Sequence, residues 1–404
     1  MTAMSAGQAR PEGRPHGIPR GLRHTGPVLL SYGFRPFFLG AGIVAVAAMG
    51  LWIAAIAGGL PVGGAYGAVG WHAHEMLFGF GSAVLAGFLM TAIPNWTGKM
   101  PLAGGPLAAL ALLWLAGRLA MLWAGPLAVV IDALFLPVLL AVCGREIVAG
   151  GQWTNLRVLG GVAIVALANI GFHAEVLLTG APDVAARAAV AGYVLLITII
   201  GGRIIPSFTR NWLAAAGASR LPVPFDRRDS AAILTGLAAL ACWAAAPEKW
   251  PTAAAALAGS AAVFWRLSRW RGTATWRNPL LLVLHVAFGF VGLGFLAIAS
   301  AAAGWIPVAT AMHLMMVGGI GGMMLAVMTR ATRGHTRRPL VASRWTVASY
   351  ACLFAAALAR PASDLLGEPV LLELAGGLWI GTFLLFLAEY GPMILFDRWP
   401  RRMS

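Results

Sequence analysis

WHAHEMLFGFGSAVLAGFLMTAI (residues 71–93) joins a long apolar run to three ionisable side chains at its start. A run of about 20 apolar residues is long enough to cross the hydrocarbon core of a bilayer as a helix. Its first turn carries His72, His74 and Glu75. Ionisable groups in hydrocarbon are costly and usually face a cavity, a partner or a metal. The stretch therefore predicts a membrane helix that contributes to a buried binding site.

The rest of the chain has the same apolar character. Hydrophobic residues make up 59% of the 404 residues and charged residues only 11%, whereas a soluble domain carries about 25% charged residues. Backbone in a bilayer must be helical or form a closed barrel, and barrel strands are shorter and alternate in polarity. We therefore predict an all-α, polytopic membrane protein with twelve transmembrane helices, at 37–58, 72–93, 105–124, 127–148, 156–178, 184–205, 230–247, 250–267, 278–302, 306–328, 344–361 and 371–396.

The basic residues predict how these helices are oriented. With the N-terminus inside, 25 of the 29 Lys and Arg lie in cytoplasmic segments or at the inner ends of the spans, and the others are Arg118, Arg187, Lys249 and Arg360. This bias follows the positive-inside rule and predicts that both termini are cytoplasmic. The net charge of +15 then serves orientation and contact with anionic lipids, which argues against nucleic acid as a partner.

The chain is predicted to form one domain between two short tails. Residues 1–34 are expected to be a disordered basic cytoplasmic tail, 35–398 a single membrane domain, and 399–404 a second cytoplasmic tail. The three cysteines are far apart in apolar surroundings, and no CxxC or CxxCH motif occurs. Disulfides and covalently attached haem are therefore not expected.

Five histidines within the predicted spans are the candidate ligands. Four are expected to converge on the outer half of the membrane, and one lies about 10 Å from the inner end of its span, at a rise of 1.5 Å per residue. Neutral imidazole is a common ligand of haem iron, copper and zinc, and haem b takes one or two axial histidines. The candidates for a haem or another metal are His72, His74, His173, His313 and the inner His285.

Other polar and sulfur-containing residues near these histidines suggest supporting roles. His72 and His74 lie about 200° apart around a helix, so one can face a haem while the other faces a second metal or a hydrogen-bond partner. Glu75 is expected to share the face of His72 and to orient its ring or carry protons. Glu175 is a similar candidate, Arg118 is a candidate partner for a haem propionate, and Met316, near His313, is a candidate copper ligand because thioethers suit Cu(I).

The same residue types also fit a different class of protein. Transporters use intramembrane His and Glu as proton relays. The residues therefore leave open a cofactor-free, proton-coupled transporter of small molecules. The basic segment TRATRGHT (329–336) is interpreted either as an anchor for anionic lipids or as a clamp for a propionate or another anion.

Five motifs resemble the NnrS family of bacterial membrane proteins: GFRPFFL (33–39), WHAHEMLFGF (71–80), AGFLMTAIPNWTGK (86–99), GRIIPSFTRNWL (202–213) and MTRATRGHTRRPL (328–340). The resemblance implies a twelve-helix protein of the bacterial inner membrane that contains haem and copper. It also implies a link to denitrification and to protection against nitric oxide. A distant architectural similarity to the catalytic subunits of haem–copper oxidases accompanies it. The chain lacks their adjacent His-His pair and HxxxY motif, which argues against proton-pumping oxidase chemistry.

Together these observations predict a haem b protein, with copper as a second cofactor left open, that responds to or detoxifies nitric oxide. The expected ligand is nitric oxide, bound or redox-converted at a buried haem. An oxidoreductase acting on nitric oxide and a non-catalytic sensor or assembly factor that holds haem are both compatible with the residues. The electron donor, the number of haems and the identity of the ligating histidines are not determined by the sequence.

Overall fold

Helices account for most of the computed structural model, which describes residues 26–396, and these residues contain no β-strand. The fold class predicted from the sequence, all-α, is therefore confirmed for this part of the chain. Each predicted interval coincides with a helical segment. The α-helices are α1 (Phe34–Gly58), α2 (Gly67–His74), α3 (Ser82–Thr97), α4 (Gly105–Ala120), α5 (Pro126–Ala149), α6 (Leu156–Thr179), α7 (Asp183–Leu196), α8 (Gly202–Ala215), α9 (Arg227–Ala245), α10 (Trp250–Ser268), α11 (Pro279–Ala302), α12 (Val308–His313), α13 (Gly322–His335), α14 (Arg344–Leu366) and α15 (Pro369–Leu395).

Eight of the helical segments in the described range are long and apolar enough to cross a membrane. The chain is therefore a multi-pass membrane protein. α4, α9, α10 and α14 do not meet the same criteria of length and composition, so the count of twelve transmembrane helices stays a prediction. Residues 1–25 and 397–404, which hold most of the predicted tails, lie outside the described range.

Two segments that the sequence assigned to loops are helical. α8 continues to Ala215 and α13 to His335, although the apolar runs end near 205 and 328. Both extensions are polar and basic on one side, and hydropathy marks the end of the apolar run rather than the end of the helix. The predicted spans end at 205 and 328, so the implied placement of residues 206–215 and 329–335 in loops was wrong.

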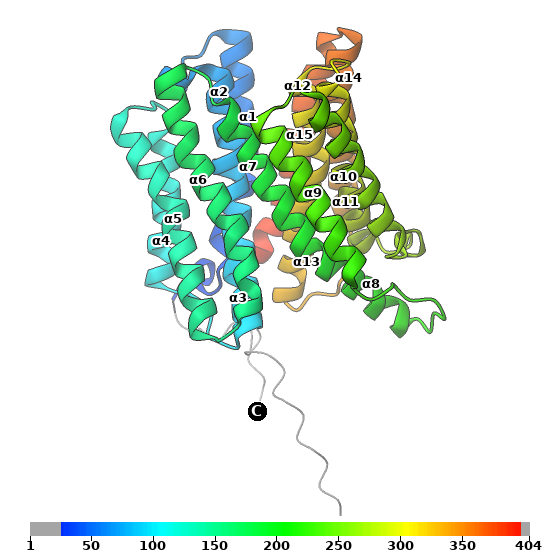
Figure 1. The fold of residues 1–404 in the computed structure, drawn as a ribbon. Coiled ribbons are helices and arrows are strands. Elements are labelled where there is room, and N and C mark those ends of the chain that lie inside the picture. The colour runs from blue at the N-terminus through cyan, green and yellow to red at the C-terminus, as the bar shows by residue number, and fades with distance from the viewer. Residues whose placement is uncertain (1–25, 397–404) are drawn as a thin grey trace, which may run out of the picture.

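Figure 1 shows two groups of helices side by side, α1–α7 and α9–α15. The packing of α1 against α15, and of α7 against α9, joins the groups. The two ends of the described chain meet at one end of the molecule, because the Arg35 guanidinium donates to the backbone oxygens of Met393 (3.1 Å) and Ile394 (2.5 Å).

Three of the long helical segments contain a π-helical turn, at η3 (Glu75–Gly81), η5 (Ile197–Gly201) and η7 (Leu314–Gly321). Such turns insert an extra residue and are frequent at functional sites. In η3, side chains from other helices donate to backbone carbonyls: Tyr193 to Leu77 (2.7 Å) and Trp114 to Gly79 (3.0 Å). All three turns line cavities between the two helix groups.

Candidate metal centre and histidine pocket

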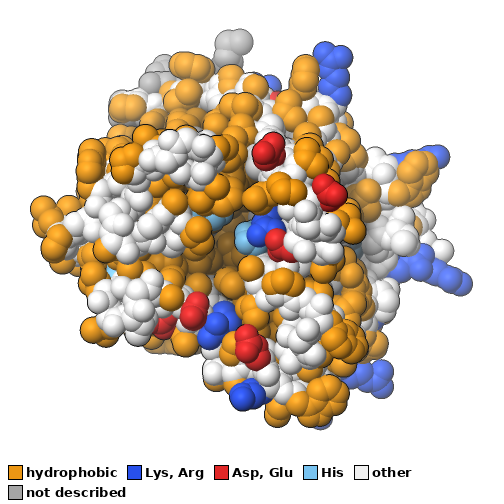
Figure 2. All heavy atoms as spheres, turned by 90° about the horizontal axis from the view of Figure 1, so that it is seen from above, with side chains coloured by type: hydrophobic (Ala, Val, Ile, Leu, Met, Phe, Trp, Pro, Cys, Tyr) orange, Lys and Arg blue, Asp and Glu red, His pale blue; other side chains and the backbone are white. Residues whose placement is uncertain are grey.

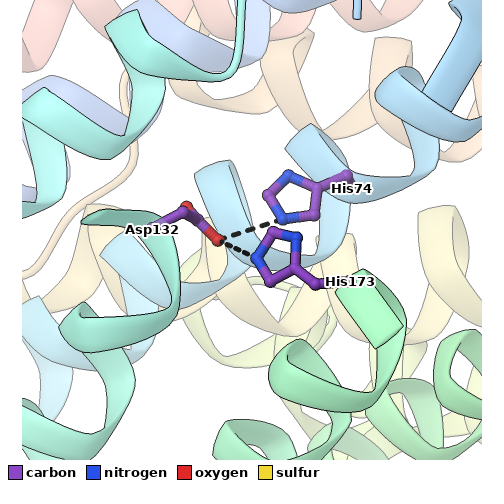
Figure 3. Close-up of side chains that lie close together, drawn as sticks. All are labelled: His74, Asp132 and His173. Atoms are coloured by element: carbon purple, nitrogen blue, oxygen red, sulfur yellow. Dashed lines mark hydrogen bonds and ion pairs between the residues drawn. The ribbon is translucent and has the colours of Figure 1, made fainter. Parts of the chain in front are cut away.

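Three side chains from three helices of the first group converge at one buried point. His74 ends α2, Asp132 lies on α5 and His173 lies on α6. Their exposed fractions are 0%, 3% and 2%. Figure 3 shows both imidazoles directed at one carboxylate oxygen: Oδ2 of Asp132 lies 3.1 Å from Nε2 of His74 and 3.0 Å from Nε2 of His173. Possible ligand atoms of these three residues, called the triad below, lie within 4.8 Å of one another.

A second layer of side chains fixes the triad. Nδ1 of His74 lies 3.2 Å from Oε1 of Glu75, and the Arg118 guanidinium donates to the same oxygen at 2.7 Å. Arg118 also pairs with Oδ1 of Asp132. The hydroxyl of Tyr66 lies 2.6 Å from Nδ1 of His173.

The two imidazoles of the triad share one pattern. Each presents Nε2 to the centre and holds Nδ1 against an oxygen of Glu75 or Tyr66. Histidines that bind metals nearly always donate their second ring N–H to an oxygen in this way, which fixes the tautomer and the ring orientation. The Asn169 amide approaches the same oxygen of Asp132 at 2.9 Å. Two imidazoles and a carboxylate form a ligand set that suits first-row transition metals.

The charges of the cluster also favour a cation. Glu75 and Asp132 carry two negative charges, while Arg118 carries one positive charge. With both imidazoles neutral, the buried cluster keeps one uncompensated negative charge, which is costly at low dielectric. A cation bound among the triad removes this imbalance and takes the place of protons between the nitrogens and Asp132.

A second imidazole pair lies in a larger, mostly apolar cavity between the two helix groups. His72 of α2 and His313 of α12 both line it, together with Met312, Met316 and Trp379. The cavity contains about 960 Å³ of empty space, including its mouth. Figure 2 looks onto this end of the molecule, where the surface is hollowed and histidine side chains are visible. This cavity is called the histidine pocket below.

The two histidines of the pocket have ring nitrogens free to bind a ligand. His313 donates from Nδ1 to the backbone oxygen of Ala309 at 2.8 Å, which leaves Nε2 as an acceptor. Nδ1 of His72 is buried without a hydrogen-bond partner among the described residues. The ring of Trp52 stacks on His72 with 4.5 Å between centroids. Arg360 lines an adjoining cavity that shares both histidines.

The structure separates His72 from His74 as their spacing predicts. His74 belongs to the triad, and His72 lines the histidine pocket. His173 also joins the triad, and Met316 lies beside His313 in the pocket. His285 is elsewhere: its Nε2 lies 2.9 Å from the Thr209 hydroxyl, on the inner part of α11.

Three charged candidates, Glu75, Arg118 and Glu175, make contacts other than those expected from the sequence. Glu75 contacts His74 and Arg118 rather than His72. Arg118 pairs with the carboxylates of Glu75 and Asp132, and its role as a propionate partner stays a prediction. Glu175 accepts from the backbone N–H groups of Val184 (3.0 Å) and Ala185 (3.1 Å) and thus caps the start of α7.

Sequence reasoning missed two residues of the cluster. Asn169 lies four positions before His173, on the same helical face, and this i, i+4 spacing within an apolar run was a usable signal. Tyr66 precedes α2 in a glycine-rich segment that gave no comparable signal. Asp132 stands out as an acidic residue within an apolar run, but no pattern in the sequence links it to His74.

Comparison with known proteins supports the resemblance inferred from the motifs. A family model described as NnrS protein matches residues 28–398, which is nearly the whole chain. No match appears among curated proteins. The matched range includes both the triad and the histidine pocket.

Proposed function

This chain belongs to the NnrS family, and we propose that it is a haem- and metal-containing protein of the bacterial inner membrane that acts in the response to nitric oxide. In this proposal the histidine pocket holds haem b, and the triad holds a second metal ion, for which copper is the first candidate. Nitric oxide is the ligand of the haem.

One observation carries this proposal. Two imidazole sites of different character lie on opposite sides of the same helical turn, one enclosed and hydrogen-bonded, the other open and apolar. The possible ligand atoms of the enclosed site lie within 4.8 Å of one another, and these donors match a metal ion. The open site is a mostly apolar cavity with two histidines in its lining, as expected of a pocket for a small molecule.

Three features of the histidine pocket suit haem. His72 and His313 offer ring nitrogens from two facing helices, and an unpartnered buried nitrogen is otherwise an energetic cost. The walls of methionine, valine and tryptophan side chains suit a flat apolar macrocycle. Arg360 lies beside both histidines, where a propionate can approach it, and it also pairs with Asp364 at 2.5 Å. When bound, haem iron supplies a coordination position for nitric oxide.

The protein's own residues prepare both sites. Trp52 holds the His72 ring by stacking. Glu75 and Arg118 hold His74 in one orientation, and Tyr66 does the same for His173. Phe78 and Phe172 pack edge-on or tilted against the His74 ring and exclude water from it. The apolar lining of the histidine pocket favours entry of a small uncharged molecule over that of ions.

The test begins with the purified protein. We expect a reduced-minus-oxidised haem spectrum, a pyridine haemochrome of haem b and a Soret shift on anaerobic addition of nitric oxide. His72→Ala and His313→Ala should lose haem, while His285→Ala, a buried histidine remote from the pocket, should keep it. Absence of iron from well-folded protein would sink the haem proposal.

The same preparation separates the alternative functions. Anaerobic consumption of nitric oxide by the reconstituted protein indicates turnover, whereas binding without consumption indicates a sensor or assembly factor. Flux of a solute driven by a pH gradient, abolished in His72→Ala without any change in absorbance, would favour the transporter.

A further inference from the structure

A second large cavity lies near the opposite end of the molecule from the histidine pocket. It contains about 1,200 Å³ of empty space, including its mouth, and lies between α3, α8, α11 and α13. Its polar lining includes Thr91, Asn95 and Arg330, and its aromatic lining includes Trp96 and Phe208. This cavity is called the inner pocket below.

Arg330 is the notable cation of the inner pocket. Its guanidinium lies 4.3 Å from the centroid of the Phe208 ring, and among residues 26–396 no carboxylate pairs with it. Arg333, one turn further along α13, behaves differently, because it pairs with Glu389 at 2.5 Å and contacts the Tyr390 hydroxyl. Of these two arginines in TRATRGHT, Arg330 is therefore the one available to an anion from outside the chain.

A second, apolar cavity adjoins the inner pocket. This neighbouring cavity, with about 500 Å³ of empty space including its mouth, shares Phe88, Ile204 and Val327 with it and is lined by apolar side chains and Tyr193. The rise along α13 from Arg330 to Met323, which lines this second cavity, is about 10 Å. The two adjoining cavities are called the groove below; Arg330 lines one of them, and the other is almost entirely apolar.

We propose that this groove binds an anionic phospholipid, with its phosphate on Arg330 and one acyl chain along the apolar cavity. Arginine binds phosphate through two parallel N–H donors, which suits it to a single fixed head group. Basic pockets between membrane helices are suited to anionic head groups. The occupant lies in the same membrane as the chain, whose net charge of +15 attracts anionic lipid. This site is independent of the haem and metal sites.

Retention of lipid tests the proposal. Protein in mild detergent is incubated with phosphatidylglycerol or phosphatidylcholine, and bound lipid is counted by native mass spectrometry. We expect one retained phosphatidylglycerol and little phosphatidylcholine. Arg330→Gln should weaken retention about fivefold, the effect of one arginine near an anionic surface. Val327→Trp, which fills the passage between the two cavities, should also reduce it.

Arg277→Gln is the matched control. Arg277 is exposed, and its guanidinium also lies over an aromatic ring, that of Trp276 at 4.6 Å, but it lines neither cavity. This variant should retain phosphatidylglycerol as the unmodified protein does. Equal retention by Arg330→Gln and the unmodified protein would overturn the proposal, as would equal binding of the two lipids.

Two further measurements distinguish a lipid site from a site for free anions and cover the case in which Arg330→Gln does not fold. Millimolar inorganic phosphate should not displace the lipid, and displacement would indicate a site for free anions instead. If Arg330→Gln does not fold, the rise in melting temperature that phosphatidylglycerol gives to the unmodified protein is compared with that of Val327→Trp. An equal rise in both would contradict the groove.

Discussion

His74 shows how strongly a single side chain can be committed to one role. Both of its nitrogens face carboxylate oxygens, at 3.1 Å and 3.2 Å, and the ring is fully buried. A ring in this position either carries two protons or carries one proton and binds a cation. The nearby Arg118 already supplies one positive charge to the same two carboxylates. A second proton on His74 or a cation bound at the triad would balance the remaining negative charge, and the proposed metal ion would do so with both imidazoles neutral.

Asp132→Asn tests the carboxylate of the triad. The substitution keeps the size of the side chain but removes the charge that binds the ion, and it leaves Arg118 with one carboxylate. We expect metal content, measured by elemental analysis of purified protein, to fall by more than about tenfold, since even outer partners of metal ligands contribute 10- to 100-fold. Glu175→Gln, which changes a capping carboxylate, should leave metal content unchanged. Full metal retention in Asp132→Asn would contradict the triad as a metal site.

Tyr66→Phe tests the support of His173. Removal of the hydroxyl takes away the oxygen 2.6 Å from Nδ1 and frees the tautomer of the ring. The affinity for metal, measured by competition with a chelator, should fall about 10- to 100-fold. Haem content should not change, because Tyr66 does not line the histidine pocket. Simultaneous loss of haem and metal would indicate a general folding defect instead.

The limits of sequence reasoning at the site are clear from these residues. The HAHE motif could be identified because ionisable groups stand out in an apolar run. Asp132 and Asn169 stand out in the same way, but the sequence does not say which helices are neighbours. The joining of α2, α5 and α6 at one point is a consequence of tertiary packing, so the partners of His74 could not be predicted.

The π-helical turn η3 lies beside the triad and contacts the ion pair that supports it. It begins directly after His74, and in its interior Gly79 allows Arg118 and Glu75 to approach the backbone. A Cβ at Gly79 would lie 2.7 Å from Oε2 of Glu75 and 3.0 Å from Nη1 of Arg118. The ion pair and the turn therefore depend on glycine at this position.

Gly79→Ala is expected to lower stability and metal content together. Overpacking of a well-packed interior typically costs about 1–3 kcal/mol, and the displaced Glu75 no longer holds His74. The melting temperature in detergent and the bound metal are the measurements. Gly377→Ala on α15 is the control, because a Cβ there meets no atom within 4 Å. Equal melting temperatures for the two variants would refute the role given to Gly79.

The helices themselves were predictable, and the π-helical turns were not. Long apolar runs require helical backbone in a membrane, so each interval such as 127–148 has its counterpart, here α5. The extra residue of η3 instead depends on donors from other helices, Tyr193 and Trp114, that fold against its carbonyls. The helical ends of α8 and α13 were missed because polar helix and polar loop have similar hydropathy.

At the scale of the molecule, the two proposed cofactor sites belong to different units. The triad is built from α2, α5 and α6 within the first helix group, while the histidine pocket lies between the groups. If the proposal holds, metal binding needs the packing of one group, and haem binding needs both groups in contact. The α1–α15 and α7–α9 contacts join the two groups. Weakening these contacts is therefore expected to reduce haem retention more than metal retention.

The orientation of the whole molecule yields the last prediction. Lys99 lies in an exposed segment between α3 and α4, and the exposed Trp305 lies between α11 and α12, four residues before Ala309, which lines the histidine pocket. In a protein whose three cysteines are replaced by alanine, Trp305→Cys should react with a membrane-impermeant maleimide in intact spheroplasts. Lys99→Cys should react only after lysis, because the basic segments are held on the cytoplasmic side. The reverse pattern would contradict the predicted topology and place the mouth of the histidine pocket on the cytoplasmic side, where nitric oxide would reach it from the cell interior.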